Sequence, residues 1–225
     1  MTATATPRAE RIRSNSADRR TRAKEDTKRT ILNAATALFE ARGYDGFSLR
    51  QVAESIGYTA TTIYLYFKDK DELLLAVCAE GFAGFGAALE AASNSTADPA
   101  LRIREIGRAY INFGLTHPVH YRVMFMQTPD FVLSAVNQPR EDVSSYQIFL
   151  DAVTAAMRAG VIPVADPLET TNLLWAGVHG LVSLSLSSKG VVPKWDEESV
   201  KRMFEVQHDL LERGWDRRIG AGVMD

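Results

Sequence analysis

The sequence predicts an all-α protein of about nine helices, in which a small helical domain near the N-terminus precedes a larger helical body. Apolar residues recur at helical spacing along most of the chain, and no strand-like alternation competes with them. The breaks between these segments are short and rich in Gly, Pro, Asn, Asp and Ser, which end helices or form turns. Residues 48–70, which read SLRQVAESIGYTATTIYLYFKDK, add two short helices joined by a tight turn.

The chain begins with a segment that lacks the side chains of a hydrophobic core. Residues 1–21 consist mainly of Thr, Ala, Ser, Asn and Arg, so we expect a disordered basic arm. Residues 1–30 hold nine Lys or Arg and four Asp or Glu, a balance of +5, so the net charge of −2 leaves −7 for the remainder. A solvated tail and an arm that follows DNA phosphates are both compatible with this composition.

The remaining helices are placed by their periodicity and by the residues at their ends. Ser48, Thr59, Asp98 and Asp166 are predicted N-caps, because their side-chain oxygens can accept from backbone N–H groups of the first turn. The two aspartates are each followed by a proline, which suits the first helical position. We predict helices over residues 23–42, 48–55, 59–66, 70–92, 99–116, 118–127, 131–159, 167–188 and 196–213.

The two short helices have the layout of a helix-turn-helix DNA reader. Val52 and Ile56 lie on one face of the first helix, and Ile63 and Phe67 lie four residues apart on the second, so these faces should meet in a core. The rest of the second helix should face outward, where hydroxyls and phenols can contact phosphate oxygens and base edges. These outward residues are Thr61, Thr62, Tyr64, Leu65 and Tyr66.

Residues 29–74 resemble the N-terminal domain of the TetR family of bacterial transcriptional regulators. The landmarks of that family occur in order over roughly 45 residues, which is more specific than a single short motif. Gly43 and the aromatic Tyr44 follow the first helix, and Lys70 opens a long fourth helix. Tyr64 and Phe67 lie in the segment that corresponds to the recognition helix of that family. The resemblance implies an all-α DNA-binding domain over residues 22–70, in which Lys70 contacts a phosphate.

Two positions depart from the pattern of that family. Ala60 and Leu65 stand where relatives often carry Lys, Arg or His, so thymine methyl contacts or DNA shape would carry more of the sequence readout. The alternative for this region is a structural domain whose exposed hydroxyls bind nothing specific. We predict DNA contacts by Ser48, Arg50, Gln51, Thr59, Ala60, Thr61, Thr62, Tyr64, Tyr66 and Lys70.

The resemblance also implies that residues 71–225 form a body that binds a small molecule and dimerises. Trp175, His179 and Gly180 resemble the signature of a Trp-His-Gly subclass, and residues 116–125, which read THPVHYRVMF, are similar to the same subclass. A buried structural Trp-His pair and a pocket wall both fit this spacing. The predicted ligand-binding residues, which could equally fill a solid core, are Phe113, Tyr121, Phe125, Phe149, Trp175 and His179.

Three glycines, Gly81, Gly84 and Gly86, interrupt the predicted helix over residues 70–92. Each glycine inside a helix destabilises it by about 0.5–1 kcal/mol relative to alanine. Close packing against a neighbouring helix could offset this loss. A hinge is the other possibility, since in TetR-like proteins this helix links the DNA-binding domain to the body.

Several other classes of protein are disfavoured. The single cysteine, Cys78, excludes an internal disulfide, and His117 and His120 have no third ligand near them in the sequence, so we predict no metal and no cofactor. No nucleophile elbow, phosphate-binding loop or paired-carboxylate motif indicates an enzyme. Residues 1–10 lack the apolar core of a signal peptide, and the longest uncharged apolar stretch, residues 172–188, is too short to span a bilayer. We therefore expect a cytoplasmic protein with no membrane partner.

Together these observations predict a homodimeric transcriptional regulator, acting as a repressor, whose affinity for DNA changes when a small molecule occupies the body. Its partners would be double-stranded DNA with a pseudo-palindromic operator, an effector of unknown identity and a second copy of the chain, bound through the helices over residues 167–188 and 196–213. The alternatives are a constitutive DNA-binding protein without an effector and, with the least support, an enzyme.

Overall fold

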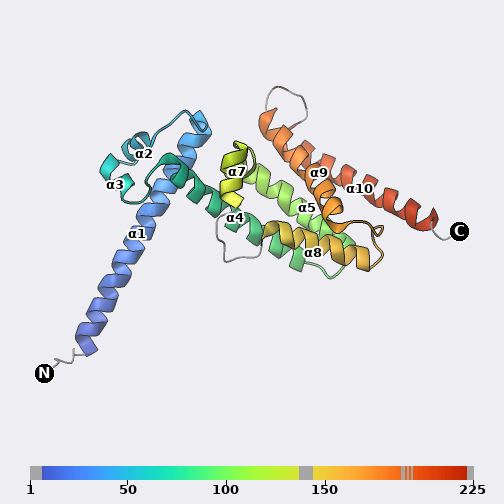
Figure 1. The fold of residues 1–225 in the computed structure, drawn as a ribbon, viewed down its shortest axis with the longest axis horizontal. Helices are drawn as coiled ribbons and strands as arrows, with labels where there is room; N and C mark the ends of the chain where they lie inside the picture. The colour runs from blue at the N-terminus through green and yellow to red at the C-terminus, as the bar shows by residue number, and fades with distance from the viewer. Residues whose placement is uncertain (1–6, 137–143, 189–190, 192, 194, 222–225) are drawn as a thin grey trace. The chain divides into compact units, whose positions relative to one another are not determined.

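In a computed structural model, residues 7–136, 144–188, 191, 193 and 195–221 are described. This part of the chain holds ten α-helices and no β-strand, which confirms the all-α prediction (Figure 1). The helices are α1 (Pro7–Arg42), α2 (Leu49–Ser55), α3 (Ala60–Tyr64), α4 (Lys70–Asn94), α5 (Pro99–Thr116), α6 (Pro118–Phe125), α7 (Pro129–Val136), α8 (Ser145–Arg158), α9 (Pro167–Ser187) and α10 (Glu197–Ala221).

The chain forms two compact units, residues 1–77 and 78–225, whose boundary lies inside α4. The first unit is called the head below and the second the body. The domain boundary predicted between residues 70 and 71 lies at the first turn of the same helix.

The head is built from the second half of α1, the short helices α2 and α3, and the first turns of α4. Gly43 and Gly57 have positive φ angles of 69° and 71°, which end α1 and α2 at the glycines the sequence offers there. The predicted core faces are buried as expected. The main buried side chains of the head are those of Ile31, Ala35, Phe39, Phe47, Leu49, Val52, Ala53, Ile63, Phe67, Leu73, Leu74 and Val77.

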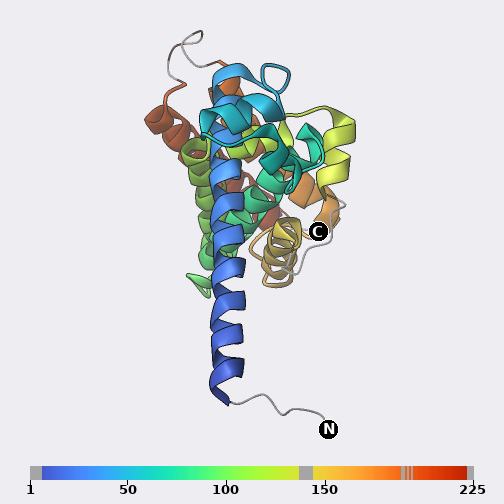
Figure 2. The same cartoon turned by 90° about the vertical axis from the view of Figure 1, so that its left-hand side faces the viewer.

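The first helix is longer than predicted. We expected it to begin near residue 23 after a disordered arm, but α1 begins at Pro7, so residues 7–21 are helical. Figure 2 shows the N-terminal half of α1 extending away from α2 and α3, and residues 18–26 of this half are exposed. Residues 8–21 contain no Gly or Pro and are rich in Ala and Arg, and a helix already anchored by Ile31 can propagate at one hydrogen bond per residue.

In the body, α5 packs against α6, α8, α9 and α10, and α9 also contacts α8 and α10 (Figure 1). The carboxylates of Asp98 and Asp166 accept from backbone N–H groups of α5 and α9, which confirms these two predicted N-caps. The predicted helix over residues 131–159 was wrong, because α7 and α8 are separate helices and residues 137–143 lie outside the described part. Pro139, inside that interval, is the sequence signal that the periodicity outweighed.

The fourth helix is long and apolar enough to cross a membrane by length and composition alone. Its large apolar side chains are nevertheless buried within the protein, including Phe82, Phe85 and Leu89, so we treat α4 as a core helix. A Cβ atom on Gly81 would lie 2.7 Å from the Met124 sulfur, so close packing accounts for this glycine.

Candidate nucleic-acid interface and effector site

The N-terminus of α2 is closed by two side chains that were predicted to contact DNA. The backbone N–H of Gln51 donates to the Ser48 hydroxyl at 3.4 Å, and the backbone N–H of Ser48 donates to the Gln51 side-chain oxygen at 3.0 Å. This reciprocal capping box satisfies two backbone donors at the start of the helix. Ser48 and Gln51 therefore position α2, and the Gln51 amide NH₂ group has donors left for DNA.

Thr59 caps α3 in the predicted way. Its hydroxyl accepts from the backbone N–H of Thr62 at 3.2 Å, and the two threonine hydroxyls lie 2.9 Å apart. Thr62 is only half exposed, so its hydroxyl is engaged within the helix. On the opposite side Ile63 and Phe67 are buried, which fixes the rotation of α3 in the head. The cap and these two anchors determine which side chains can reach a partner.

The outward side chains of α3 and of the residue that caps its C-terminus are those of Thr61, Tyr64 and Leu65. The Tyr64 side chain is 57% exposed and that of Leu65 is 78% exposed. Ala60 and Tyr66 are half-buried. The structure therefore separates two groups of predicted readers. Thr61 and Tyr64 point outward, whereas the hydroxyls of Thr59, which is also exposed, and of Thr62 are engaged in the cap of α3.

Lys70 ties the start of α4 to the turn after α1. Its ammonium donates to the Tyr44 carbonyl at 2.8 Å and lies 4.4 Å from the centre of the Tyr44 ring. The Tyr44 hydroxyl bonds to Asp71, and this bond with a negative carboxylate raises the pKa of Tyr44 to about 12. An ammonium group has three N–H donors, so Lys70 can hold this turn and still contact a phosphate, as the sequence predicts.

Other cations of the head are held weakly. Arg50 pairs with Glu54 at 3.3 Å and Lys68 with Asp69 at 3.9 Å, and the side chains of both cations are more than three-quarters exposed. Pairs of this kind contribute about 0–1 kcal/mol and are screened by salt. Both side chains are therefore able to turn toward phosphates.

In the body, four polar side chains from α5, α6 and α9 form one hydrogen-bonded cluster, called the Tyr-His cluster below. The Trp175 indole N–H donates to the Tyr110 hydroxyl at 3.1 Å, and the Tyr110 and Tyr121 hydroxyls are 3.0 Å apart. The Tyr121 hydroxyl lies 2.7 Å from Nδ1 of His179. The Tyr110 hydroxyl also lies 3.3 Å from the same nitrogen. From one face of α9, Trp175 thus bonds to Tyr110 and His179 bonds to both phenols, as their spacing suggested.

The Tyr-His cluster is uncharged near neutral pH. Burial raises the pKa of Tyr110 to about 12 and also raises that of Tyr121, so both phenols keep their protons. Burial lowers the pKa of the His179 imidazole, which favours its neutral form. Since Trp175 donates to Tyr110, all partners are satisfied when Tyr110 donates to Tyr121 and Tyr121 donates to Nδ1 of His179. The His179 Nε2–H then remains available as a donor.

Aromatic rings from α4, α5 and α6 surround the cluster. The ring centroids of Phe125 and Tyr121 are 5.0 Å apart, and that of Phe85 lies 5.1 Å from those of both Tyr110 and Phe113. The rings of Phe85 and Phe125 meet edge to face. Five of the six predicted ligand-binding residues therefore come together here: Phe113, Tyr121, Phe125, Trp175 and His179. Tyr110 and Phe85 were missed, although Tyr110 lies three residues before Phe113 on the same face of α5.

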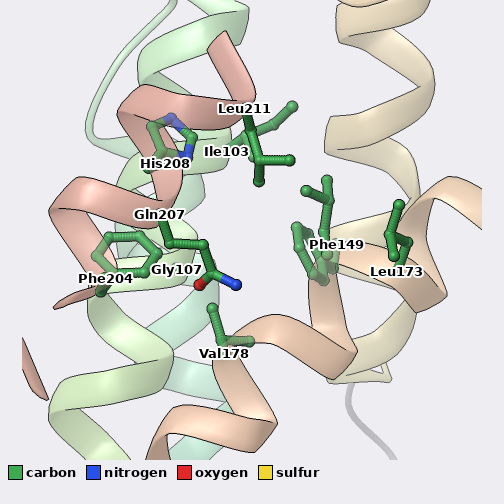
Figure 3. A pocket seen from close by; sticks show the side chains of 10 residues that line it. Ile103, Gly107, Phe149, Leu173, Val178, Phe204, Gln207, His208 and Leu211 are labelled. Carbon is green, nitrogen blue, oxygen red and sulfur yellow. The ribbon is translucent and has the colours of Figure 1, made fainter. Parts of the chain in front are cut away.

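The sixth predicted residue, Phe149, lies elsewhere. It lines a cavity of about 110 Å³ between α5, α8, α9 and α10, and the other five predicted residues do not line this cavity. Figure 3 shows the Gln207 side chain extending into the space between Phe204 and Phe149. Phe204 packs directly on Gly107, where a Cβ atom would lie 2.5 Å from the ring. Phe149 is thus separated from the Tyr-His cluster, contrary to our grouping.

Ion pairs fasten α10 to α5 beside this cavity. Arg104 pairs with Glu205 at 3.1 Å and with Asp209, and Arg108 pairs with Glu205 at 2.7 Å. The nearby arginines lower the pKa of Glu205, chiefly through its hydrogen bond with Arg108. Arg104 is the most buried of these side chains, so it gains more from the pairs than an exposed arginine would.

The two last helices expose large apolar side chains. Leu168, Leu173 and Leu184 on α9 and Val206 and Leu210 on α10 are between 49% and 67% exposed. Leu210 also lines a groove along α10 with Met203. Scattered exposed leucines are ordinary, but five large apolar side chains exposed on two neighbouring helices, called the exposed row below, are of the kind that protein interfaces cover.

Comparison with known proteins agrees with this architecture. Residues 31–77 match the family model described as bacterial regulatory proteins, tetR family. Residues 103–211 match a model described as a tetracyclin repressor-like C-terminal domain. The second match supports the family and does not identify the Trp-His-Gly subclass.

Relatives with curated functions are transcriptional regulators. The HTH-type transcriptional regulator RutR of Escherichia coli O157:H7 is 27% identical over 162 residues, covering 72% of this chain and 76% of RutR. The probable HTH-type regulator YttP of Bacillus subtilis is 33% identical over 72 residues, which are 32% of this chain and 35% of YttP. A solved structure of a Rhodococcus sp. RHA1 protein with unknown function is 27% identical, with a TM-score of 0.67 over 84% of this chain and 94% of that one. The chain therefore belongs to the TetR family and is a DNA-binding transcriptional regulator.

Proposed function

We propose that the protein is a homodimeric repressor that binds a pseudo-palindromic operator through α3 and is released when a small molecule binds in the body. The observation that carries the DNA-binding half is the geometry of α3. Its cap and two buried anchors leave Thr61, Tyr64 and Leu65 exposed on one surface of the head. Such a short, rigidly held helix with hydroxyl groups outward suits entry into the major groove.

The exposed row on α9 and α10 supports dimerisation. One head contacts only a few base pairs, and a second head about 34–36 Å away would add a second half-site on the same side of the duplex. A second copy that covered Leu184 and Leu210 would remove apolar surface from water. The exposed row of one chain would pack against the same row of a second chain, because a two-fold interface joins identical surfaces.

The Tyr-His cluster supports an effector site in the body. It combines aromatic surface with a few convergent polar groups, which is the usual composition of a small-molecule site. Because the cluster carries no net charge, an uncharged or weakly polar effector would fit it better than an ion. The likeness of Trp175, His179 and Gly180 to the Trp-His-Gly signature is part of the same proposal. So is a cytoplasmic location, where the protein would meet DNA.

A constitutive DNA-binding protein is the second candidate. It is favoured by the close ring contacts of the cluster, with centroid distances of 5.0 Å to 5.9 Å, which a solid core would also give. The two candidates differ in one measurable respect, because a ligand that binds only the folded protein raises its melting temperature.

The test has two stages with the full chain. Duplexes selected from a random pool would first be titrated by fluorescence anisotropy at several salt concentrations, and the logarithm of the association constant should fall linearly with that of salt. A set of small molecules would then be tested for thermal stabilisation and for loss of operator binding. Absence of any sequence preference in the first stage would contradict operator binding, and compounds that stabilise the protein but leave operator affinity unchanged would contradict release.

A further inference from the structure

Leu65 is the most exposed large apolar side chain of the described head. It is 78% exposed, beside Tyr64 at 57%, and it follows α3 in the turn that leads to Phe67. Ile63 and Phe67 on the opposite side are 0% and 3% exposed, so α3 cannot rotate to bury Leu65 without exposing its anchors. The leucine therefore stays on the same surface as the tyrosine.

The chemistry of this side chain restricts what it can contact. Leucine has no hydrogen-bond donor or acceptor, so it gains nothing from phosphate oxygens or from the polar edges of the bases. In the major groove, one group of the four base pairs is apolar, the C5-methyl of thymine. No methyl group is exposed in the minor groove. If α3 lies in the major groove, Leu65 either meets a thymine methyl or stays against water.

The surroundings argue for a duplex as the partner. Lys68, three residues further along, is 77% exposed, and Thr61, four residues earlier, presents a hydroxyl and a methyl group. The apolar area that one leucine and one tyrosine expose here is far smaller than the apolar core of a stable protein interface. The same combination suits DNA, where the cation meets phosphate and the apolar group meets a base edge.

We infer that Leu65 is a specificity-determining residue that contacts the methyl group of one thymine in each half-site of the operator. The inference rests on the proposed binding of DNA through α3 and goes beyond it by naming the base and the group that is read. Thr61 lies on the same stripe of the helix, so its hydroxyl can bond to a neighbouring base edge while Leu65 covers the methyl.

The experiment uses duplexes selected by the full-length wild-type protein. Each thymine in turn would be replaced by deoxyuridine, which removes the methyl group and keeps the hydrogen-bonding edge. We expect one position per half-site at which this change weakens binding about fourfold, the value of burying one methylene-sized group, and more than about tenfold when both half-sites are changed.

Three variants assign that loss to a residue. Leu65→Ala should bind the thymine duplex more weakly than the wild type does. The variant should bind the thymine and uracil duplexes with equal affinity, because the side chain that contacted the methyl group is gone. Leu65→Met keeps an apolar side chain of similar volume and should keep part of the uracil penalty. Tyr64→Phe, on the same surface, should lower affinity for both duplexes and leave the penalty unchanged.

Two results would overturn the inference while leaving operator binding intact: equal binding of thymine and uracil duplexes at every position by the wild type, or an undiminished uracil penalty in Leu65→Ala. A uniform loss of affinity for all sequences in Leu65→Ala would also overturn it, since that is a structural effect. Circular dichroism and the melting temperature should match the wild type, because Leu65 has little contact to lose. If the wild type selects no duplex, the proposed function fails together with the inference.

Discussion

The head and the body use polar side chains in opposite ways. In the head, the threonine and serine hydroxyls that shape the surface bond to backbone groups three residues away, as Thr59 does with Thr62. In the body, Trp175 and His179 bond to tyrosines 65 and 58 residues earlier in the chain. The surface of the head is thus set by local rules of helix capping, whereas the interior of the body depends on long-range packing. Changes to the head should therefore alter recognition and leave the body stable, and changes to the body should alter stability or assembly.

The largest expected effect breaks the link between two heads. Leu184→Glu or Leu210→Glu places a charge on the exposed row of α9 and α10, which a second copy would bury. We expect a folded monomer whose operator affinity falls at least about a hundredfold. The reason is that the two heads are no longer joined, so binding of one head does not hold the other beside the second half-site. Analytical ultracentrifugation and anisotropy measure both quantities. The matched control is Leu101→Glu, an exposed leucine on α5, and a monomeric wild type at micromolar concentration would contradict this use of the row.

The next effect tests the long-range cluster. Tyr121→Phe removes the hydroxyl between Tyr110 and His179 and leaves Nδ1 of the imidazole with the longer contact, 3.3 Å, to the Tyr110 hydroxyl. We expect a loss of about 1–3 kcal/mol in the free energy of unfolding, measured by urea titration. Tyr146→Phe is the control, because the Tyr146 hydroxyl bonds to Asn172 on an exposed surface, where water can replace it. If both variants lost the same free energy of unfolding, the buried hydrogen bonds of the cluster would contribute no more to stability than an exposed one.

The third effect tests the local rule in the head. Thr59→Ala removes the N-cap of α3 and should destabilise the head by about 1 kcal/mol. Thr61→Ala, two residues later and exposed, should change stability by less than about 0.5 kcal/mol but lower operator affinity. Thermal melts and anisotropy separate the two. The distinction between a positioning and a reading threonine is wrong if Thr61→Ala lowers the melting temperature as much as Thr59→Ala.

A smaller effect concerns Lys70. Since its ammonium holds the Tyr44 carbonyl and has further donors, Lys70→Ala should reduce the slope of affinity against salt by about one unit per neutralised phosphate in a half-site. Lys68→Ala offers a comparison, because the Lys68 side chain is 77% exposed and forms a weak ion pair with its neighbour Asp69 at 3.9 Å. If Lys70→Ala lowers stability and leaves the salt slope unchanged, the lysine serves the fold alone.

The smallest effect is a dependence on pH that should belong to the body, since all four histidines lie between residues 117 and 208. Burial lowers the pKa of His179 below its unfolded value of about 6.5, so the unfolded chain binds more protons as the pH falls. The contribution to stability is therefore present above about pH 6.5 and is lost as the pH falls below it. Urea titrations at pH 7.5 and 5.5 should show this loss, and His179→Gln should reduce it. An unchanged pH dependence in that variant would place the effect on other groups.

The head could be predicted in detail because its signals lie close together in the sequence. Ser48, Thr59 and Gly57 mark helix ends by local hydrogen bonding and backbone geometry, and Ile63 and Phe67 mark a buried face by spacing alone. Periodicity could not predict which hydroxyl groups of α3 form hydrogen bonds within the helix cap and which are exposed. Thr61 and Thr62 look alike in the sequence, and only the capping geometry separates the exposed Thr61 from Thr62, whose hydroxyl is engaged in the cap.

The body was predicted less completely. Helix periodicity located the segments, and Trp175 and His179 were placed correctly on one face. The separation of Phe149 from the other aromatics and the inclusion of Tyr110 and Phe85 were not predicted. Any of these rings could have faced any apolar neighbour, since the hydrophobic effect has no direction and does not select partners.

By itself, then, the sequence determined the elements whose causes are local: most of the helices among the described residues, their caps and the family. It missed the early start of α1, the break between α7 and α8 and the extension of α10 to Ala221. Tertiary structure alone decided which residues of α5, α6 and α9 meet in the Tyr-His cluster, that a Cβ atom on Gly81 or Gly107 would crowd Met124 or Phe204, and that Leu65 stays exposed. The physical reason is that capping and periodicity act within about four residues, whereas close packing depends on the shapes of helices far apart in the chain.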